Sequence, residues 1–195
     1  MVSNYRIILA SASPRRRELL AGLGLQFEVR VLSSIDESYP PELQGGDIPL
    51  YISRAKAEAY RATLTHDELL ITADTIVWLH GHVLGKPHSE DEARQMLAQL
   101  SGNTHQVYTG VTLTTTRHSE SFSCRSDVTF ATLTAEEIDH YVTHYHPLDK
   151  AGAYGIQEWI GYVGVKSITG SFYNVMGLPI QRLYQQLKSF ANKQK

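Results

Sequence analysis

Hydrophobic residues follow two different periods along this chain of 195 residues. Short apolar or alternating runs, which are typical of strands, occupy residues 5–10, 27–31 and 69–78. Apolar positions that recur every three or four residues, which is typical of helices with one buried face, occupy residues 14–23, 49–64, 90–100, 135–144 and 180–190. Because strands and helices alternate, we expect an α/β fold.

The middle of the chain contains two strand-like segments in succession. Residues 105–116 and 121–132 are rich in threonine, valine and tyrosine, and they predict a hairpin that turns at residues 117–120. A further strand is expected at residues 162–168. Because a hairpin is antiparallel, we predict a mixed central sheet with flanking helices.

Several helix starts carry capping signals. Ser13 suits the N-cap of the first helix, because a serine hydroxyl accepts from a free backbone N–H there. Ser89 with Glu92, and Thr134 with Glu137, have the spacing of a capping box. We therefore expect helices to begin directly after Ser13, Ser89 and Thr134.

The helix expected over residues 49–64 mixes apolar and charged positions. The apolar positions with a helical period are Tyr51, Ile52, Ala55, Ala59 and Ala62. Lys56 falls among the interleaved charged residues. Its side chain is long enough to reach a phosphate, although a surface lysine is the default interpretation.

Length and composition limit the class of protein. We expect a single domain over residues 1–195, with two lobes around a cleft and a frayed tail from about residue 191. The net charge of −2 argues against a protein that coats nucleic acid or binds membranes through a basic surface. The single cysteine, Cys124, excludes an internal disulfide and argues against a thiolate zinc site. With no apolar run of roughly 18 residues and no signal-peptide core, a cytoplasmic protein is expected.

Asp74 interrupts the most apolar strand of the chain, residues 69–78. An ionised carboxylate in such a strand costs several kcal/mol unless a cation or hydrogen-bond donors meet it. The strand alone leaves two interpretations open, a core aspartate paired with one basic residue and a functional carboxylate. The surrounding residues must decide between them.

Other segments offer partners for a phosphate or a cation. At residues 11–17, a turn that begins with Ser11 leads into a helix whose first turn carries Arg15 and Arg16. Free backbone N–H groups and guanidinium groups favour phosphate binding at such a helix start. The alternative is a solvated basic turn. Asp36 and Glu37 are adjacent in the loop that follows the strand expected at residues 27–31, and their carboxylates could bind a divalent cation. A solvated acidic turn is the simpler interpretation. Lys86 lies on a loop between Gly85 and Pro87.

Residues 149–157 follow no simple period. Small residues there permit close approach of a ligand, and Asp149, Lys150 and Gln157 supply an acceptor, a cation and an amide; the alternative is an ordinary glycine loop. His140 and His144 have the spacing of a two-histidine metal pair, but a surface pair is the favoured interpretation.

Together these residues favour a polyphosphate site. The basic groups are Arg15, Arg16, Lys56, Lys86 and Lys150, and the carboxylates that could hold a cation or activate water are Asp36, Glu37, Asp74 and Asp149. The chain has no Walker motif, which excludes a P-loop, and no Ser-His-Asp elbow.

Five motifs resemble the signatures of the Maf family, in the family's order and over nearly the whole chain. They are Ser-Ala-Ser-Pro-Arg-Arg at 11–16, Ala-Asp-Thr-Ile-Val at 73–77, Gly-Lys-Pro at 85–87, Asp-Lys-Ala-Gly-Ala-Tyr-Gly-Ile-Gln at 149–157, and Gly-Ser-Phe-Tyr-Asn-Val-Met-Gly-Leu-Pro at 170–179. The resemblance implies a house-cleaning nucleoside triphosphate pyrophosphatase with an inosine-triphosphatase-like fold. It also implies a divalent cation, Mg²⁺ or Mn²⁺, and dTTP and UTP as substrates.

The resemblance also assigns roles to individual residues. Asp74 matches the family's catalytic acid or base and, with Glu37, its metal site. Arg15, Thr75 and Gln157 match its specificity positions. The polyphosphate site and the resemblance together predict a substrate-binding set of Ser11, Arg15, Arg16, Lys56, Thr75, Lys86, Lys150 and Gln157.

Two alternatives remain at this point. One is a nucleotide-sensing regulator of septum formation without significant turnover, and the other is the sister branch of the family that acts on methylated GTP. Apart from a nucleoside triphosphate, we expect no nucleic-acid or membrane partner. The sequence leaves a homodimer, the preferred metal and the physiological substrate open.

Overall fold

The computed structural model describes residues 5–192. Its first elements are β1 (Arg6–Leu9), α1 (Pro14–Ala21), β2 (Phe27–Val29), α2 (Asp47–Tyr60), the 3₁₀ turn η1 (Arg61–Thr63), β3 (Glu68–Leu79), β4 (His82–Leu84) and α3 (Glu90–Leu100). They are followed by β5 (Thr104–Thr114), β6 (Ser119–Phe130), α4 (Ala135–Tyr145), η2 (Pro147–Asp149), η3 (Ala151–Ala153), α5 (Trp159–Val163), β7 (Val165–Thr169), α6 (Phe172–Val175) and α7 (Ile180–Asn192). Of the tail expected to be frayed, residues 191 and 192 end α7, and residues 193–195 lie outside the described residues.

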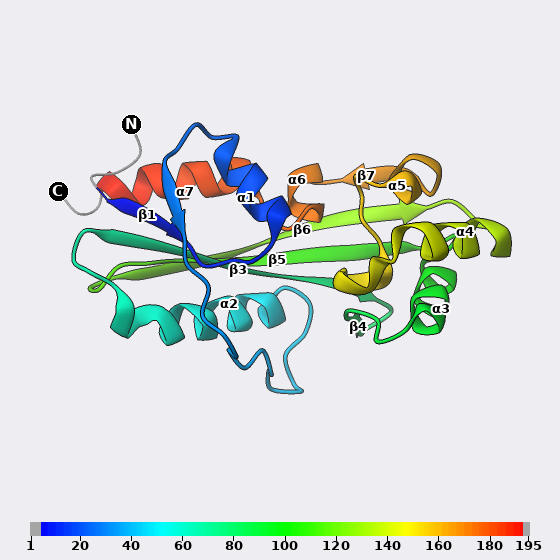
Figure 1. The fold of residues 1–195 in the computed structure, drawn as a ribbon, viewed down its shortest axis with the longest axis horizontal. Helices are drawn as coiled ribbons and strands as arrows, with labels where there is room; N and C mark the ends of the chain where they lie inside the picture. Colours follow the sequence, from blue (N-terminus) through cyan, green and yellow to red (C-terminus); the bar gives the residue numbers. More distant parts are fainter. Residues whose placement is uncertain (1–4, 193–195) are drawn as a thin grey trace. The chain divides into compact units, whose positions relative to one another are not determined.

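The strands of residues 5–192 form one mixed seven-stranded sheet. Its order is β2-β1-β3-β5-β6-β7, and β4 pairs with β3. β1 runs parallel to both β2 and β3, whereas the β3–β4 and β6–β7 pairs are antiparallel. The predicted hairpin is present as β5 and β6, and the predicted mixed α/β fold is confirmed (Figure 1).

The described chain divides into two compact units, in agreement with the two lobes expected. The first unit contains the residues up to Asp74, Thr109–Cys124 and the residues from Gly177 on. The second unit contains Thr75–Tyr108 and Arg125–Met176. β3, β5 and β6 each contribute residues to both units.

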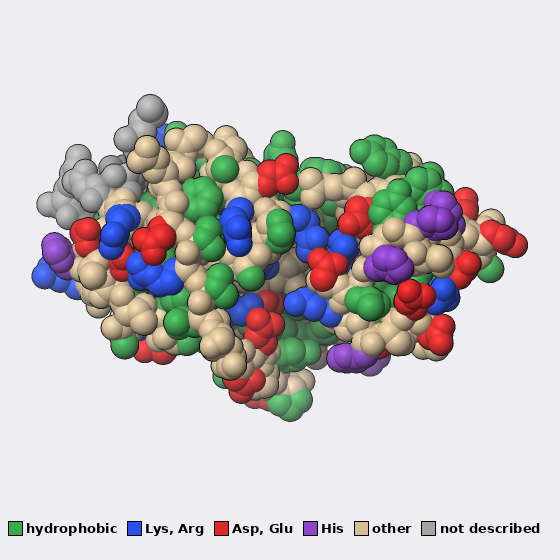
Figure 2. All heavy atoms as spheres, in the orientation of Figure 1, with side chains coloured by type: hydrophobic (Ala, Val, Ile, Leu, Met, Phe, Trp, Pro, Cys, Tyr) green, Lys and Arg blue, Asp and Glu red, His purple; other side chains and the backbone are tan. Residues whose placement is uncertain are grey.

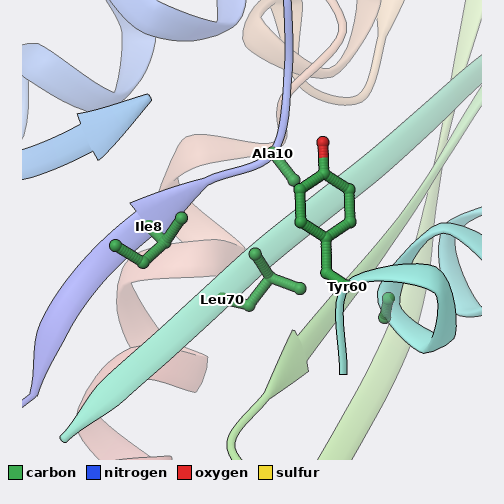
Figure 3. Packing of buried hydrophobic residues seen from close by; sticks show 5 residues of the cluster. Ile8, Ala10, Tyr60 and Leu70 are labelled. Atoms are coloured by element: carbon green, nitrogen blue, oxygen red, sulfur yellow. The ribbon is translucent and has the colours of Figure 1, made fainter. Parts of the chain in front are cut away.

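In the first unit, helices cover both faces of the strands. α1 and α7 lie on one face and α2 lies on the other (Figure 1). A buried cluster contains Ile8 and Ala10 from the β1 segment, Leu70 from β3, and Ala57 and Tyr60 from α2. Figure 3 shows the Tyr60 ring over these strands. Burial of these side chains fixes α2 against the sheet.

In the second unit, an aromatic cluster lies among the strands and the 149–157 segment. The rings of His105, Phe130 and Tyr154 meet edge to face, with centroids 5.1–5.4 Å apart. The Tyr154 hydroxyl is 2.8 Å from Nε2 of His105. Burial lowers the pKa of His105 to about 4, so this ring is neutral at neutral pH.

Two local predictions for the second unit were wrong in part. The strand expected at residues 162–168 begins only at Val165, because residues 159–163 form α5. Gly161 permits this helix, since a Cβ there would lie 1.9 Å from the carbonyl oxygen of Ile156. The capping box of Ser89 is half formed, because the Glu92 carboxylate accepts from the N–H of His88 instead. The box of Thr134 is complete.

No helix within residues 5–192 is long and apolar enough to cross a membrane.

Candidate active site

Asp74 lies inside the first unit, where an ammonium group meets it. Its residue is only 8% exposed, and Oδ1 accepts a hydrogen bond from Nζ of Lys56 at 2.8 Å. The same Nζ lies 2.9 Å from Oε1 of Glu37, whose side chain is 55% exposed. One lysine therefore holds two carboxylates, one from a buried strand and one from an exposed loop.

The position of Lys56 follows from the face of α2 that packs on the sheet. The buried positions of this helix include Ile52, Ser53, Ala57 and Tyr60, which together with Lys56 form one helical face. The apolar face expected from the sequence was therefore wrong, apart from Ile52. Tyr51, Ala59 and Ala62 are exposed and Ala55 is partly buried. Lys56 is not the surface lysine of the default interpretation, because its side chain is only 12% exposed.

Hydroxyl groups and a glycine set the distance between α2 and the strands. Thr72 Oγ1 donates to the carbonyl of Ser53 at 2.7 Å, and Ser53 Oγ lies 2.9 Å from Thr112 Oγ1. A Cβ on Gly110 would lie 2.3 Å from the backbone of Pro49, so only glycine permits this approach. Thr72 is two residues before Asp74 on the strand, and Ser53 is one helical turn before Lys56. The hydroxyl contacts therefore place Lys56 beside Asp74.

Tyr60 anchors the start of the loop that carries Glu37. Its hydroxyl accepts from the N–H of Leu32 at 2.7 Å and donates to the carbonyl of Arg30 at 3.0 Å. Farther along this loop, both oxygens of Asp36 accept from Ser38, at 2.8 Å each, and these bonds lower the pKa of Asp36. Asp36 thus shapes the turn, whereas Glu37 reaches Lys56.

The N-terminus of α1 brings cationic groups into the same unit. Ser13 caps the helix as predicted, and the Ser11 hydroxyl accepts from the N–H of Ser13 at 3.2 Å. Nε of Arg16 donates to the carbonyl of Gly177 at 2.8 Å. Burial lowers the pKa of Arg16, and the neighbouring charge of Arg15 lowers it further.

Arg16 also interacts with the carboxylates of this unit. The charge of Asp74 opposes the burial effect on the Arg16 pKa, and the charge of Glu37 does so more weakly. Asp74 therefore has two cationic neighbours, Lys56 and Arg16. The first unit thus brings together Asp74, Glu37, Lys56 and Arg16 from the predicted set.

A divalent cation fits the oxygen atoms of this cluster only with help from a ligand. Glu37 and Asp74 converge on one cationic position, now held by Lys56. Mg²⁺ is commonly bound by one or two carboxylates together with water and substrate phosphates. Within residues 5–192, no group of three or more His, Cys, Asp or Glu side chains could hold a metal. The two carboxylates therefore suit a divalent cation that takes its other ligands from water or from a bound phosphate.

The predicted residues Thr75, Lys86, Lys150 and Gln157 belong to the second unit. The exposed Lys86 follows Gly85, whose carbonyl accepts from the N–H of Gly152 at 2.9 Å. Gly152 has a φ of +68°, and a Cβ there would lie 3.0 Å from the side chain of Val77 on β3. The loop of Lys86 and the loop that follows Lys150 are thus joined.

Lys150 is buried and paired with two carboxylates. Its Nζ lies 2.7 Å from Oδ1 of Asp149 and 3.1 Å from Oε1 of Glu158. Gln157 is exposed in the turn directly before Glu158, and Thr75 is partly buried on β3. Asp149, one of the carboxylates suggested for a cation or for water, serves here as a partner of Lys150.

Sequence reasoning missed several residues that contact the predicted site residues or the segments that carry them. They are Ser53, Thr72 and Thr112 in the first unit and Tyr141 and Glu158 in the second. Only Thr72 carried a signal, because it lies two residues before Asp74 and so faces the same side of the strand.

The histidine pair has local partners. Figure 2 shows histidine side chains at the surface over α4. The rings of His140 and His144 lie 4.3 Å apart between centroids, and Nδ1 of His144 is 2.7 Å from the carbonyl oxygen of His140. One ring nitrogen is therefore already hydrogen-bonded, which supports the interpretation as a surface pair.

An open pocket of about 490 Å³ lies on the other side of α2. It is lined by Leu32, Ser33, Ser34, Ile35, Asp36, Ser38, Tyr51, Ala55 and Ala59. Of the carboxylates proposed from the sequence, it contains Asp36. Neither Asp74 nor Lys56 lines it.

Known proteins resemble this chain over nearly its full length. The family model for Maf-like proteins matches residues 6–190. A dTTP/UTP pyrophosphatase of Phocaeicola vulgatus is 63% identical over 187 residues, which cover 96% of this chain and 97% of that protein. A dTTP/UTP pyrophosphatase of Bacteroides thetaiotaomicron has the same identity and coverage.

A solved structure resembles the fold. A HAM1 protein from Coxiella burnetii superposes with a TM-score of 0.50 at 12% identity, covering 95% of this chain and 99% of that protein. This likeness concerns the fold alone, and it agrees with the predicted fold class.

Proposed function

The chain belongs to the Maf family, and we propose that it hydrolyses dTTP and UTP to the nucleoside monophosphate and pyrophosphate. The observation that carries this proposal is the shared Lys56, which holds the buried Asp74 and the exposed Glu37 at 2.8 and 2.9 Å. A triphosphate with its cation can replace the lysine between these carboxylates. A cytoplasmic location is part of the proposal and is supported by the single cysteine.

Asp74 is the proposed base. In the reaction, a water oxygen attacks the α-phosphorus, the bond between the α-phosphorus and the bridging oxygen breaks, and pyrophosphate leaves with that oxygen. The proton lost by water passes to the Asp74 carboxylate. Because β3 and α2 hold this carboxylate in place, it needs little reorganisation to accept the proton.

Glu37 and Asp74 are the proposed ligands of Mg²⁺ or Mn²⁺. When bound, the cation would neutralise phosphate charge and lower the pKa of a water molecule. Glu37 is suited to this role because it lies on an exposed loop and can exchange Lys56 for a metal ion. Asp74 supplies the rigid side of the pair.

Basic side chains and the Ser11 hydroxyl are the proposed phosphate ligands. The basic residues are Arg15, Arg16, Lys56, Lys86 and Lys150. Guanidinium and ammonium groups stabilise the charge that grows on the leaving pyrophosphate. The N-terminus of α1 adds backbone N–H groups and a positive dipole end for a phosphate.

Base recognition is proposed for Gln157, with Arg15 and Thr75 as further specificity residues. Uracil and thymine share a pairing edge of carbonyl, N–H and carbonyl, and an amide can complement part of it. Cytosine reverses donor and acceptor at two of these positions. Gln157 is suited to such a role because it is exposed on a turn that Glu158 fixes.

Pyrophosphate release from a nucleotide panel tests the function directly. The purified protein with Mg²⁺ should release pyrophosphate from UTP and dTTP faster than from CTP, GTP and a methylated GTP. Excess EDTA should stop the reaction. Absence of pyrophosphate from every nucleotide would favour the regulator, and a preference for methylated GTP would favour the sister branch.

A further inference from the structure

Glu158 connects Lys150 to the core of the second unit. Its Oε1 lies 3.1 Å from Nζ of Lys150, and its Oε2 accepts a hydrogen bond from the hydroxyl of Tyr141. Tyr141 is fully buried. The carboxylate is thereby held by a side chain that has no room to move, and Lys150 is held by the carboxylate.

The backbone before Glu158 closes around the same carboxylate. The N–H of Gly155 donates to the Tyr141 hydroxyl oxygen at 3.0 Å, and the N–H of Glu158 donates to the Gly155 carbonyl at 3.0 Å. A Cβ on Gly155 would lie 2.8 Å from Cδ of Glu158. Glycine at 155 thus permits the turn that carries Gln157 to lie against Glu158.

The tyrosine remains a donor over the whole neutral range. Burial raises the pKa of Tyr141, and its hydrogen bond to Glu158 raises it further. The hydroxyl therefore keeps its proton and its bond to the carboxylate. This leaves the other oxygen of Glu158 directed at Lys150.

The two carboxylates around Lys150 differ in their surroundings. The Asp149 side chain is 65% exposed, against 27% for Glu158. Water screens the pair with Asp149, so an incoming phosphate can replace that pair at little cost. The pair with Glu158 is anchored and persists.

We propose that Glu158 is a positioning residue, which holds the Lys150 ammonium for the triphosphate and orients the turn of Gln157 for the base. This rests on the proposed function, because it assumes that Lys150 and Gln157 bind the nucleotide. Glu158 acts through these neighbours and takes no part in the chemical step. Its loss should therefore affect substrate binding more than turnover of bound substrate.

A double-mutant cycle between Glu158 and Lys150 tests the proposal. Glu158→Gln keeps the shape and the acceptor for Tyr141 but removes the charge that holds Lys150. We expect KM for UTP to rise on the order of tenfold, kcat to change less than threefold, and the UTP to CTP preference to fall severalfold. In a Lys150→Ala background, Glu158→Gln should raise KM less than twofold.

A structural role would give a different result. If Glu158 only stabilised the second unit, Glu158→Gln and Lys150→Ala would each lower Tm. Their effects on KM would then be independent and would multiply in the double variant, which would overturn the proposal. Tyr141→Phe is a second variant, which removes the donor but keeps the ring, and it should raise KM about threefold. Asp139→Asn, at an exposed carboxylate on α4, is the matched control and should leave KM unchanged.

The result also separates the two proposals. If the unmodified protein releases no pyrophosphate from any nucleotide, the proposed function fails. If it releases pyrophosphate and Glu158→Gln leaves KM and selectivity unchanged, only the positioning role fails.

Discussion

Strand β3 carries two buried carboxylates that have different cationic partners, Glu68 at the start of the strand and Asp74 six residues later. Both oxygens of Glu68 accept from Arg30, at 3.1 and 2.7 Å, and Arg6 donates to Oε1 at 2.5 Å. The N–H of Thr65 adds a bond of 3.0 Å to Oε2. Fixed donors therefore hold every side of Glu68.

Asp74 has different partners. Its Oδ1 accepts a hydrogen bond from Lys56, which also pairs with the exposed Glu37. A carboxylate bound by two guanidinium groups is held in place as part of the fold, whereas one that shares a lysine can exchange it for a metal ion. The kind of partner therefore distinguishes the two carboxylates of this strand: guanidinium groups hold Glu68, and a shared lysine holds Asp74.

The largest expected effect is the loss of turnover in Asp74→Asn. The amide keeps the shape but removes the base and a metal ligand, so kcat/KM for UTP should fall about 10³-fold or more. Pyrophosphate release measures this, and Tm should stay near that of the unmodified protein. Asp67→Asn, at an exposed aspartate just before β3, is the control. Near-normal turnover in folded Asp74→Asn would refute the catalytic role, and unfolding would favour the salt-bridge interpretation.

In contrast to Asp74→Asn, Glu68→Gln should lower stability and leave turnover unchanged. The substitution removes the buried charge that pairs with Arg6 and Arg30, and Arg30 keeps only its more exposed pairing with Glu28 among the ion pairs described. Breaking a buried ion pair in this way destabilises a protein by roughly 3–5 kcal/mol. Urea unfolding measures this loss, and kcat per folded molecule should stay unchanged. Reduced kcat at unchanged stability would reverse the comparison between the two carboxylates.

Acid should destabilise the protein partly through Glu68. Hydrogen bonds from Arg30 lower its pKa in the folded chain to about 2, below the ordinary value of 4.5. Its stabilising contribution is thus complete above pH 4.5 and is lost as the pH falls toward 2. This contribution is about 3 kcal/mol. Unfolding free energies between pH 6 and 3 should decline less in Glu68→Gln, and equal slopes in both proteins would contradict the assignment.

A smaller effect is expected for the exposed partner of Lys56. Glu37→Gln removes one charged oxygen ligand, so the Mg²⁺ concentration for half-maximal activity should rise on the order of tenfold. A Mg²⁺ titration at saturating UTP measures it. Glu42→Gln, at an exposed glutamate of the same loop, serves as the control. An unchanged Mg²⁺ requirement would remove Glu37 from the metal site.

The smallest expected change concerns base selectivity. Each unpaired buried group costs about 1–3 kcal/mol, so CTP should react roughly tenfold to a hundredfold more slowly than UTP for each mismatch. Gln157→Glu should reduce this preference severalfold with less effect on UTP itself, whereas Arg15→Ala should weaken turnover of all nucleotides. Equal kcat/KM for UTP, CTP and GTP in the unmodified protein would refute base reading.

Local signals were sufficient for much of the fold. The apolar run around Asp74 predicted β3, and Ser13 and Thr134 marked the starts of α1 and α4. These features depend on residues that are close together in the chain, so they can be recognised from the sequence. Errors arose where a distant or flanking group competed, as when the N–H of His88 took the Glu92 carboxylate.

The sequence by itself determined which chemical groups are available: a carboxylate in a buried strand, arginines at a helix start, and the loops that carry Lys86, Lys150 and Gln157. The tertiary structure decided which of them meet. Whether Lys56 faces solvent or Asp74 depends on the rotation of α2, and Gly110, Ser53 and Thr72 set that rotation from three separate segments. Likewise, the hydrogen bond between Tyr141 and Glu158 requires that α4 packs beside the turn that carries Glu158. Such contacts join residues far apart in the chain, so no local period encodes them.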